Sequence, residues 1–131
     1  MRQEHIIKIQ LIEQEASQLN EQLKLIELNI SELNELNSSL NELEVSKEIL
    51  ANLGKKIYLP VQIKDDKLII DVGKGNFVKK NISDTIKIIE NQIENLANAK
   101  YQIYQRLENL QKEMDNLAVE IGKEESGKMK K

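Results

Sequence analysis

Two long stretches of the chain carry apolar residues at alternating intervals of three and four. In residues 1–53 these are Ile9, Ile12, Ala16, Leu19, Leu23, Ile26, Ile30, Leu33 and Leu40, and Asn37 takes one place in the series. This spacing gives a helix one narrow apolar stripe, as in the seam of a coiled coil. Gly54 then favours a helix end, because glycine readily adopts the left-handed conformation that closes helices. After Leu33 a second apolar series, Leu36, Leu40, Leu43 and Ile49/Leu50, continues out of phase with the first. Together the two series predict a helix over residues 1–53.

The second stretch, residues 82–122, has the same repeat. Its members are Ile82, Ile86, Ile89, Ile93, Leu96, Ile103, Leu107, Leu110, Met114, Leu117 and Ile121, with Lys100 as the one breach. Asn81 is predicted to cap this helix, and Gly122 to end it. The polar segment 123–131 has no period and is predicted to be disordered. Two seams of similar length favour an antiparallel coiled coil, and hence a mainly α fold.

Residues 54–81 alternate apolar and polar side chains, as strands do. The apolar positions are Ile57, Leu59, Val61 and Ile63, followed by Leu68, Ile70, Val72 and Phe77. We predict a β-hairpin segment of two or three strands that completes a single domain over residues 1–125. A sheet this small does not fold stably alone. We therefore expect its apolar side chains, Ile63 apart, to form an interface with other subunits.

Composition narrows the possible chemistry. The 131 residues include no cysteine, which excludes disulfides, thiolate metal sites and a cysteine nucleophile. His5 is the one histidine, and its place near the N-terminus predicts a solvated side chain. Gly73-Lys74-Gly75 fits a tight turn better than a phosphate loop, because the fuller P-loop pattern is missing. These observations predict a protein that is not an enzyme and that has no cofactor and no metal.

Charge and hydropathy bear on location and partners. The net charge is −3, and the N-terminal stretch has no long apolar run, so we expect no signal peptide and no membrane span. A cytoplasmic protein is the default expectation. Acidic residues outnumber basic ones by ten to four between Arg2 and Glu48, a balance that argues against an RNA-contacting helical arm.

The middle segment also resembles a known family. Ile57-Tyr58-Leu59-Pro60-Val61 and Val72-Gly73-Lys74-Gly75-Asn76-Phe77-Val78-Lys79, set between two heptad arms, look like a prefoldin alpha-type subunit. The resemblance implies an ATP-independent chaperone that holds unfolded client polypeptides at coiled-coil tips and passes them to a group II chaperonin. It also implies a hexamer in which two alpha subunits pair with four beta-type subunits. Neither nucleic acid nor membrane is an implied partner.

One departure from the family pattern leaves alternatives open. Alpha-type subunits have two hairpins, whereas Val61 is followed almost at once by Leu68, so the sequence predicts about one strand fewer than the family pattern has. A single-hairpin, beta-type subunit therefore remains an alternative. A coiled-coil scaffold or adaptor without chaperone activity is the competing functional class.

Four apolar residues that fall outside the seams are candidates for client binding. They are Ile6, Ile7 and Leu11 in the first arm and Val119 in the second. If the arms are antiparallel, all four lie at the end of the coiled coil that carries the chain termini. Exposed aliphatic side chains there would bind apolar groups of an unfolded chain weakly and without sequence preference.

Overall fold

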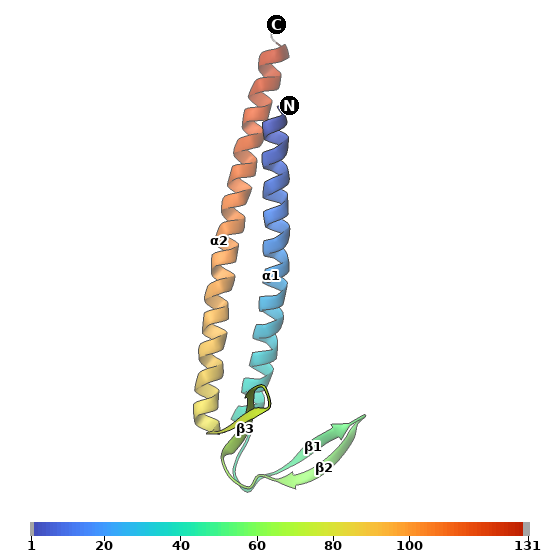
Figure 1. Ribbon diagram of the computed structural model, residues 1–131, viewed down its shortest axis with the longest axis vertical. Coiled ribbons are helices and arrows are strands. Elements are labelled where there is room, and N and C mark those ends of the chain that lie inside the picture. Colours follow the sequence, from blue (N-terminus) through green and yellow to red (C-terminus); the bar gives the residue numbers. More distant parts are fainter. Residues whose placement is uncertain (1, 130–131) are drawn as a thin grey trace. The chain divides into compact units, whose positions relative to one another are not determined.

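A computed structural model describes residues 2–129 (Figure 1). Along the chain, a long helix is followed by four short strands and then by a second long helix. The elements are α1 (Gln3–Asn41), β1 (Glu48–Gly54), β2 (Ile57–Gln62), β3 (Lys67–Gly73), β4 (Asn76–Asn81) and α2 (Ile82–Met129). The mainly α fold with a small β segment is thus confirmed. The chain divides into two compact units, described separately below. Residues up to Ile30 and from Asn95 onward form the helical unit, and Ser31–Glu94 form the hairpin unit.

In the helical unit, α1 and α2 lie side by side and run in opposite directions (Figure 1). Leu110 is 2% exposed and Leu117 is 7% exposed, whereas Leu25, one position outside the seam, is 63% exposed. The other predicted seam residues of both arms are half-buried or buried. Burial therefore follows the three-four spacing, which confirms the predicted seam.

The breach at Lys100 is accommodated by polar partners. Its side chain is half-buried, with Nζ 3.5 Å from Glu27 Oε1 and 5.8 Å from the centre of the Tyr104 ring. The Tyr104 hydroxyl donates a hydrogen bond of 3.3 Å to the same carboxylate oxygen. A lysine in the seam is thus tolerated because its ammonium group lies near the Tyr104 ring of its own helix and near the Glu27 carboxylate of the facing helix.

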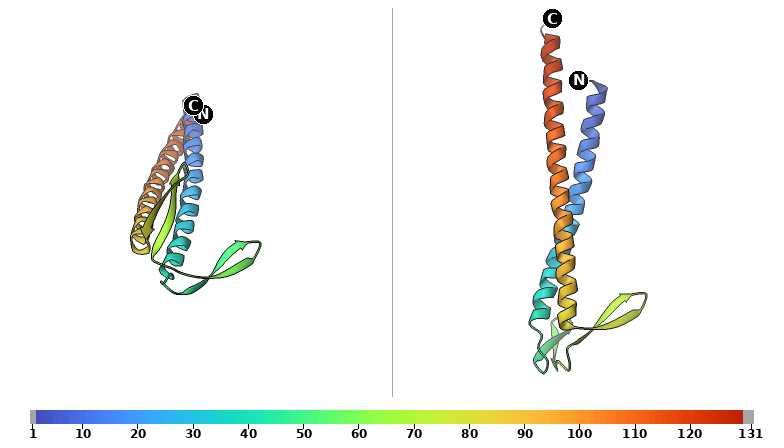
Figure 2. Two further views of the ribbon diagram at one scale, coloured as in Figure 1. Left: turned by 60° about the horizontal axis from the view of Figure 1, so that its bottom comes forward. Right: turned by 90° about the vertical axis from the view of Figure 1, so that its left-hand side faces the viewer.

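The hairpin unit contains two separate antiparallel hairpins, β1–β2 and β3–β4 (Figure 2). They share one local design. Asn52 Oδ1 accepts a 2.8 Å hydrogen bond from the Gly54 amide, and Asp71 Oδ1 accepts the equivalent bond from Gly73. Each strand pair has a register shift at this point, between Asn52 and Gly54 and between Asp71 and Gly73. The two residues that follow each glycine have positive φ, as two-residue hairpin turns with native twist require.

The turn prediction for Gly73-Lys74-Gly75 is confirmed, and so is the cap of the second helix. Asn81 Oδ1 accepts a 2.7 Å hydrogen bond from the Asp84 amide. This bond satisfies one of the free donors in the first turn of α2. The Asp66 carbonyl accepts another hydrogen bond from the Ile82 amide at 2.9 Å, so the residue just before β3 is joined directly to the first residue of α2.

The predicted extent of the first helix is wrong. Helix α1 ends at Asn41, and Glu48–Gly54 form strand β1, which pairs with β2. Glu44 and Lys47 occupy the two seam positions that follow Leu40, so continuing the helix would bury charge instead of apolar surface. Gly54 does adopt positive φ, at 114°, but it does so in a hairpin rather than at a helix end. The segment therefore has four strands, not two or three, and the strand that appeared to be missing precedes Ile57.

The predicted end of the second helix is also wrong. Helix α2 continues through Gly122 to Met129, so the segment from residue 123 to residue 129 is helical, not disordered. The predicted disorder at residues 130 and 131 lies outside the described residues. A Cβ built on Gly122 meets nothing within 4 Å, and its φ is not in the left-handed region. Gly122 is therefore an ordinary helix-interior residue.

We predict that Gly122→Ala stabilises the chain. Glycine costs about 0.5–1 kcal/mol relative to alanine inside a helix, and the position has room for the methyl group. Urea unfolding followed by circular dichroism should show a gain of that size. A loss of stability would mean that Gly122 closes a helix in the left-handed conformation, where alanine is strained.

Candidate binding surfaces

The first candidate surface is one face of the β1–β2 hairpin. The cross-strand pairs Ile49–Val61 and Ala51–Leu59 place their side chains on the same face. Leu59 is 48% exposed and Ile57 is 60% exposed, while Val61 is half-buried. The three predicted interface residues of this strand are thus placed on one hairpin, largely open to solvent in the single chain.

The remaining predicted interface residues lie on the two faces of the β3–β4 hairpin, one of which lines a cavity. Leu68, Ile70 and Val72 line a cavity of about 510 Å³. Its other walls come from the ends of both helices in the hairpin unit, including Leu33, Leu36, Leu40, Ile88 and Ile89. Leu68 and Ile70 are half-buried, and Val72 is 58% exposed. This face is therefore partly covered by the chain itself.

Phe77 lies on the opposite face of this hairpin. It pairs with Asp71, and the adjacent same-face pair is Ile69–Lys79. Phe77 is 64% exposed and Ile69 is 70% exposed. The sequence reasoning had not assigned Ile69 to a surface, because it kept only the even-numbered residues of this strand. The face on which Phe77 lies depends on the register between β3 and β4, and the sequence alone does not fix that register.

Three further exposed apolar residues of the hairpins were missed. Leu50, Leu53 and Tyr58 are 63%, 65% and 52% exposed. Leu50 and Leu53 had been assigned to a helix. A signal was present: Asn52-Leu53-Gly54-Lys55 has the same order of residue types as Asp71-Val72-Gly73-Lys74, which would have predicted a second hairpin.

The second candidate surface is the terminal end of the helical unit, where the start of α1 meets the last turns of α2. Ile6, Ile7, Leu11 and Val119 are respectively 39%, 49%, 60% and 57% exposed. Leu11 lines a cavity of about 450 Å³ together with Ile12, Leu110 and Leu117. The structure thus brings α1 and α2 candidates to the same end of the coil and leaves all four open to solvent.

His5 lies at this end, and the prediction that it is solvated is wrong. The residue is 7% exposed. Its Nε2 is 3.4 Å from Glu120 Oε2, and its Nδ1 is 3.5 Å from Glu124 Oε2. Arg2 Nε lies 3.2 Å from the other oxygen of Glu124. His5 stands four residues before Ile9, so it continues the seam by one more place, which explains its burial.

An ion pair between Glu15 of α1 and Arg106 of α2 links the two helices farther from the chain termini. Arg106 donates from Nε to Glu15 Oε2 at 2.5 Å and from Nη2 to Glu15 Oε1 at 2.9 Å. This side-chain hydrogen bonding holds the pKa of the Glu15 carboxyl below its ordinary value and raises the pKa of Arg106. Both side chains are 40–45% exposed, so solvent screens much of the interaction.

Among residues 2–129, histidine, aspartate and glutamate form no group of three that could hold a metal ion. Within the same part of the chain, neither helix has a stretch apolar and long enough to cross a membrane.

Comparison with known proteins gives a consistent set of relatives. The family described as "Prefoldin subunit" matches residues 12–125. The prefoldin subunit alpha of Archaeoglobus fulgidus is 32% identical over 126 residues, covering 91% of this chain and 90% of that protein. The prefoldin subunit alpha of Methanococcus vannielii is 26% identical over 122 residues, covering 92% and 84%.

A solved structure shows the same fold. The cryo-EM structure of filamentous PFD from Methanocaldococcus jannaschii matches with a TM-score of 0.52 at 20% sequence identity. The match covers 88% of this chain and 93% of that chain. Both proteins therefore share the arrangement of two long helices around a small β segment.

We predict that Glu15→Gln lowers the melting temperature near neutral pH by only a few degrees, because exposed ion pairs contribute little. The Glu15 carboxyl has a lowered pKa in the folded chain, so its contribution is present above its ordinary pKa and is lost as pH falls through the lowered value. The variant and the wild type should therefore converge in acid. Glu13→Gln, at an exposed position of α1, is the matched control. A Glu15→Gln difference that persists undiminished in acid would contradict this account.

Proposed function

We propose that this chain, which belongs to the prefoldin family as an alpha-type subunit, works in an oligomeric holdase that binds unfolded polypeptides without using ATP. Membership of the family makes it a chaperone subunit. The observation that carries the finer proposal is the placement of its exposed apolar residues. Most of them lie on the hairpins, where subunits can pair, or at the terminal end of the helical unit, where clients can bind. Others, among them Leu25, Leu28 and Tyr101, are exposed along the helices outside both places.

The hairpins support assembly through their uncovered faces. Ile57, Leu59 and Phe77 are each about half exposed or more, and each two-stranded sheet keeps two edges open to further pairing. Burying one such side chain contributes roughly 1.5–3 kcal/mol. We propose that beta-type subunits cover these faces, with two alpha subunits and four beta subunits in the complex.

The terminal end supports client binding through side chains that the seam does not use. Ile6, Ile7, Leu11 and Val119 lie outside the seam, in which Leu110 and Leu117 are buried at this end. Unfolded chains present scattered apolar groups, and several aliphatic contacts of modest strength suffice to retain them. We propose that these four residues are this subunit's client contact.

The proposed transfer of clients and the absence of an ATP requirement rest on the resemblance to the prefoldin family. A client held at a coil end remains accessible to a second chaperone, and a group II chaperonin in the cytoplasm is the proposed recipient. No step of holding requires a chemical energy source, because release follows from competition for the same apolar groups. A scaffold or adaptor without chaperone activity is the alternative; it predicts assembly through the hairpins and no effect on client aggregation.

We predict that Ile57→Asp combined with Leu59→Asp prevents assembly. Ile57 and Leu59 are 60% and 48% exposed in the single chain, so covering both in a complex gains about half of the full-burial value. Replacing them by carboxylates removes about 1.5–3 kcal/mol, or roughly ten- to a hundred-fold in association, and also places charge in an apolar contact. Multi-angle light scattering after size-exclusion chromatography with a beta-type partner should show separate subunits. Leu25→Asp with Leu28→Asp, two exposed positions of α1, is the control and should still assemble. Full assembly of the hairpin variant would rule out the β1–β2 face as an interface.

We predict that replacing Ile6, Ile7, Leu11 and Val119 together by serine abolishes most of the holdase activity of the assembled complex. The readout is light scattering by a denatured client diluted into native buffer. A control variant changes three other exposed apolar residues to serine, namely Leu25, Leu28 and Tyr101, and should suppress aggregation like the wild type.

Helicity and complex size are measured for both variants. If the terminal-end variant assembles normally and still suppresses aggregation, the client site lies elsewhere. If neither variant nor the wild type suppresses aggregation, the scaffold alternative is correct.

A further inference from the structure

The terminal end contains a buried histidine beside two carboxylates, and neither assembly nor client binding uses this cluster. The side chain of Glu120 is 60% exposed and that of Glu124 is 27% exposed. The imidazole of His5 is 9% exposed, yet its Nδ1 has no hydrogen-bond partner, the only such buried side-chain atom among the described residues. Each ring nitrogen instead faces a carboxylate oxygen of α2 at 3.4–3.5 Å. Buried polar atoms left unpaired are costly, so this arrangement calls for an explanation.

The protonation state of the His5 ring explains this arrangement. A neutral imidazole has one donor and one acceptor nitrogen, so one of its nitrogens must present a lone pair to a carboxylate. The charged imidazolium has two N–H donors and can serve Glu120 and Glu124 at once with charge-assisted hydrogen bonds. The cluster is therefore complementary to the protonated ring and poorly matched to the neutral one.

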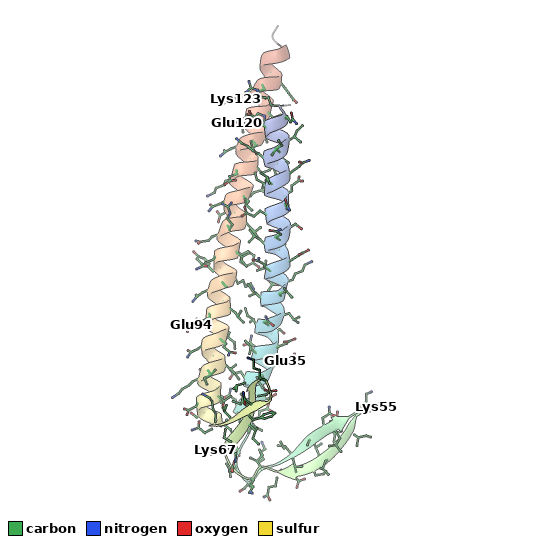
Figure 3. All side chains as sticks on the ribbon, in the orientation of Figure 1. Glu35, Lys55, Lys67, Glu94, Glu120 and Lys123 are labelled. Atoms are coloured by element: carbon green, nitrogen blue, oxygen red, sulfur yellow. The ribbon has the colours of Figure 1, made fainter. Side chains whose placement is uncertain are left out.

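Beyond Glu120 and Glu124, the charged residues near His5 are Arg2, Glu4 and Lys8 in the sequence and Lys123 on α2. Three of these four are basic. Figure 3 shows Glu120 and Lys123 on the last turns of α2 beside the start of α1. Arg2 shares Glu124 with the ring, whereas Glu120 has no other ion-pair partner among the described residues. The contact between His5 and Glu120 is thus the one most sensitive to the ring's charge.

The position of the cluster links it to the proposed client contact. His5 precedes Ile6 and Ile7 directly, and Glu120 follows Val119 directly. His5 also forms the last seam layer before the N-terminal end of α1, which begins at Gln3. Loss of this layer would free the first turns of α1 and expose the half-buried Ile9 and Ile12 as additional apolar surface.

We propose that His5, Glu120 and Glu124 form a proton-dependent clasp that closes the terminal end of the coiled coil when the imidazole is charged and releases it when the imidazole is neutral. The proposal rests on the client site proposed above and adds its regulation. The geometry of the closed arrangement matches the charged ring, so closure is favoured in mild acid and opening increases as pH rises. Client holding increases in the same direction, because opening exposes seam residues.

The chain is well suited to a direct test, since it has one histidine and no cysteine. Spin labels on Gln3→Cys and Glu125→Cys, both exposed positions of the helical unit, report the separation of the helix ends. The labelled chain is diluted into unlabelled chain in the assembled complex, so that only distances within one subunit are measured. Distance distributions are recorded at about pH 5.5 and about pH 8, which span the range in which histidines ordinarily titrate.

The expected result is a narrow distribution in mild acid and a broader, longer one at the higher pH. His5→Gln, which cannot take a charge, should give the broad distribution at both pH values. His5→Leu, which restores an apolar seam residue, should give the narrow one at both. A wild-type distribution that is the same at both pH values would overturn the proposal, as would a His5→Gln variant that retains the wild-type response to pH.

Client aggregation is measured on the same samples, so failure of the clasp and failure of the client site are distinguishable. A pH-dependent distance without any suppression of aggregation would leave the clasp standing and refute the holdase. Suppression of aggregation with an invariant distance would leave the holdase standing and refute the clasp.

Discussion

The narrow apolar seam is the interaction on which the rest of the structure depends. Alternating three- and four-residue spacing keeps one stripe of each helix facing its partner, and Ile103, Leu110 and Leu117 are buried members of that stripe. Because the seam uses only two positions in seven, other apolar residues on the same helices stay at the surface. Ile7 and Val119 are exposed for this reason, and not because the helices are loosely packed.

The same constraint explains where the first helix stops. After Leu40 the seam positions fall on Glu44 and Lys47, which gain nothing from facing a partner helix. The chain turns there and continues as two hairpins of one design, each built around a glycine capped by an Asn or Asp side chain two residues earlier. Two such hairpins have more apolar surface than the chain can cover by itself, and this surplus is the physical reason to expect partner subunits.

Much of this architecture could be predicted from the sequence, because the seam is a direct consequence of residue spacing. Lys100 was recognised as a breach, and the cap at Asn81 was placed correctly. Strand β1 was missed because Ile49, Leu50 and Leu53 also fit a helix, and local pattern does not tell which strand will pair with β2. The burial of His5 was missed because the seam was taken to begin at Ile9. Which face of a hairpin Phe77 occupies depends on register, a property of the paired strands and not of either one alone.

Hydrogen exchange of the β1–β2 hairpin tests the central claim most directly, namely that the hairpins are completed by other subunits. In the isolated chain at high dilution, amides of residues 48–62 should exchange rapidly, while those near Leu110 in the seam remain protected. On assembly with a beta-type partner, the account predicts a large gain of protection over residues 48–62 and little change near Leu110. Hairpin amides that are already as protected in the isolated chain as in the complex would contradict it.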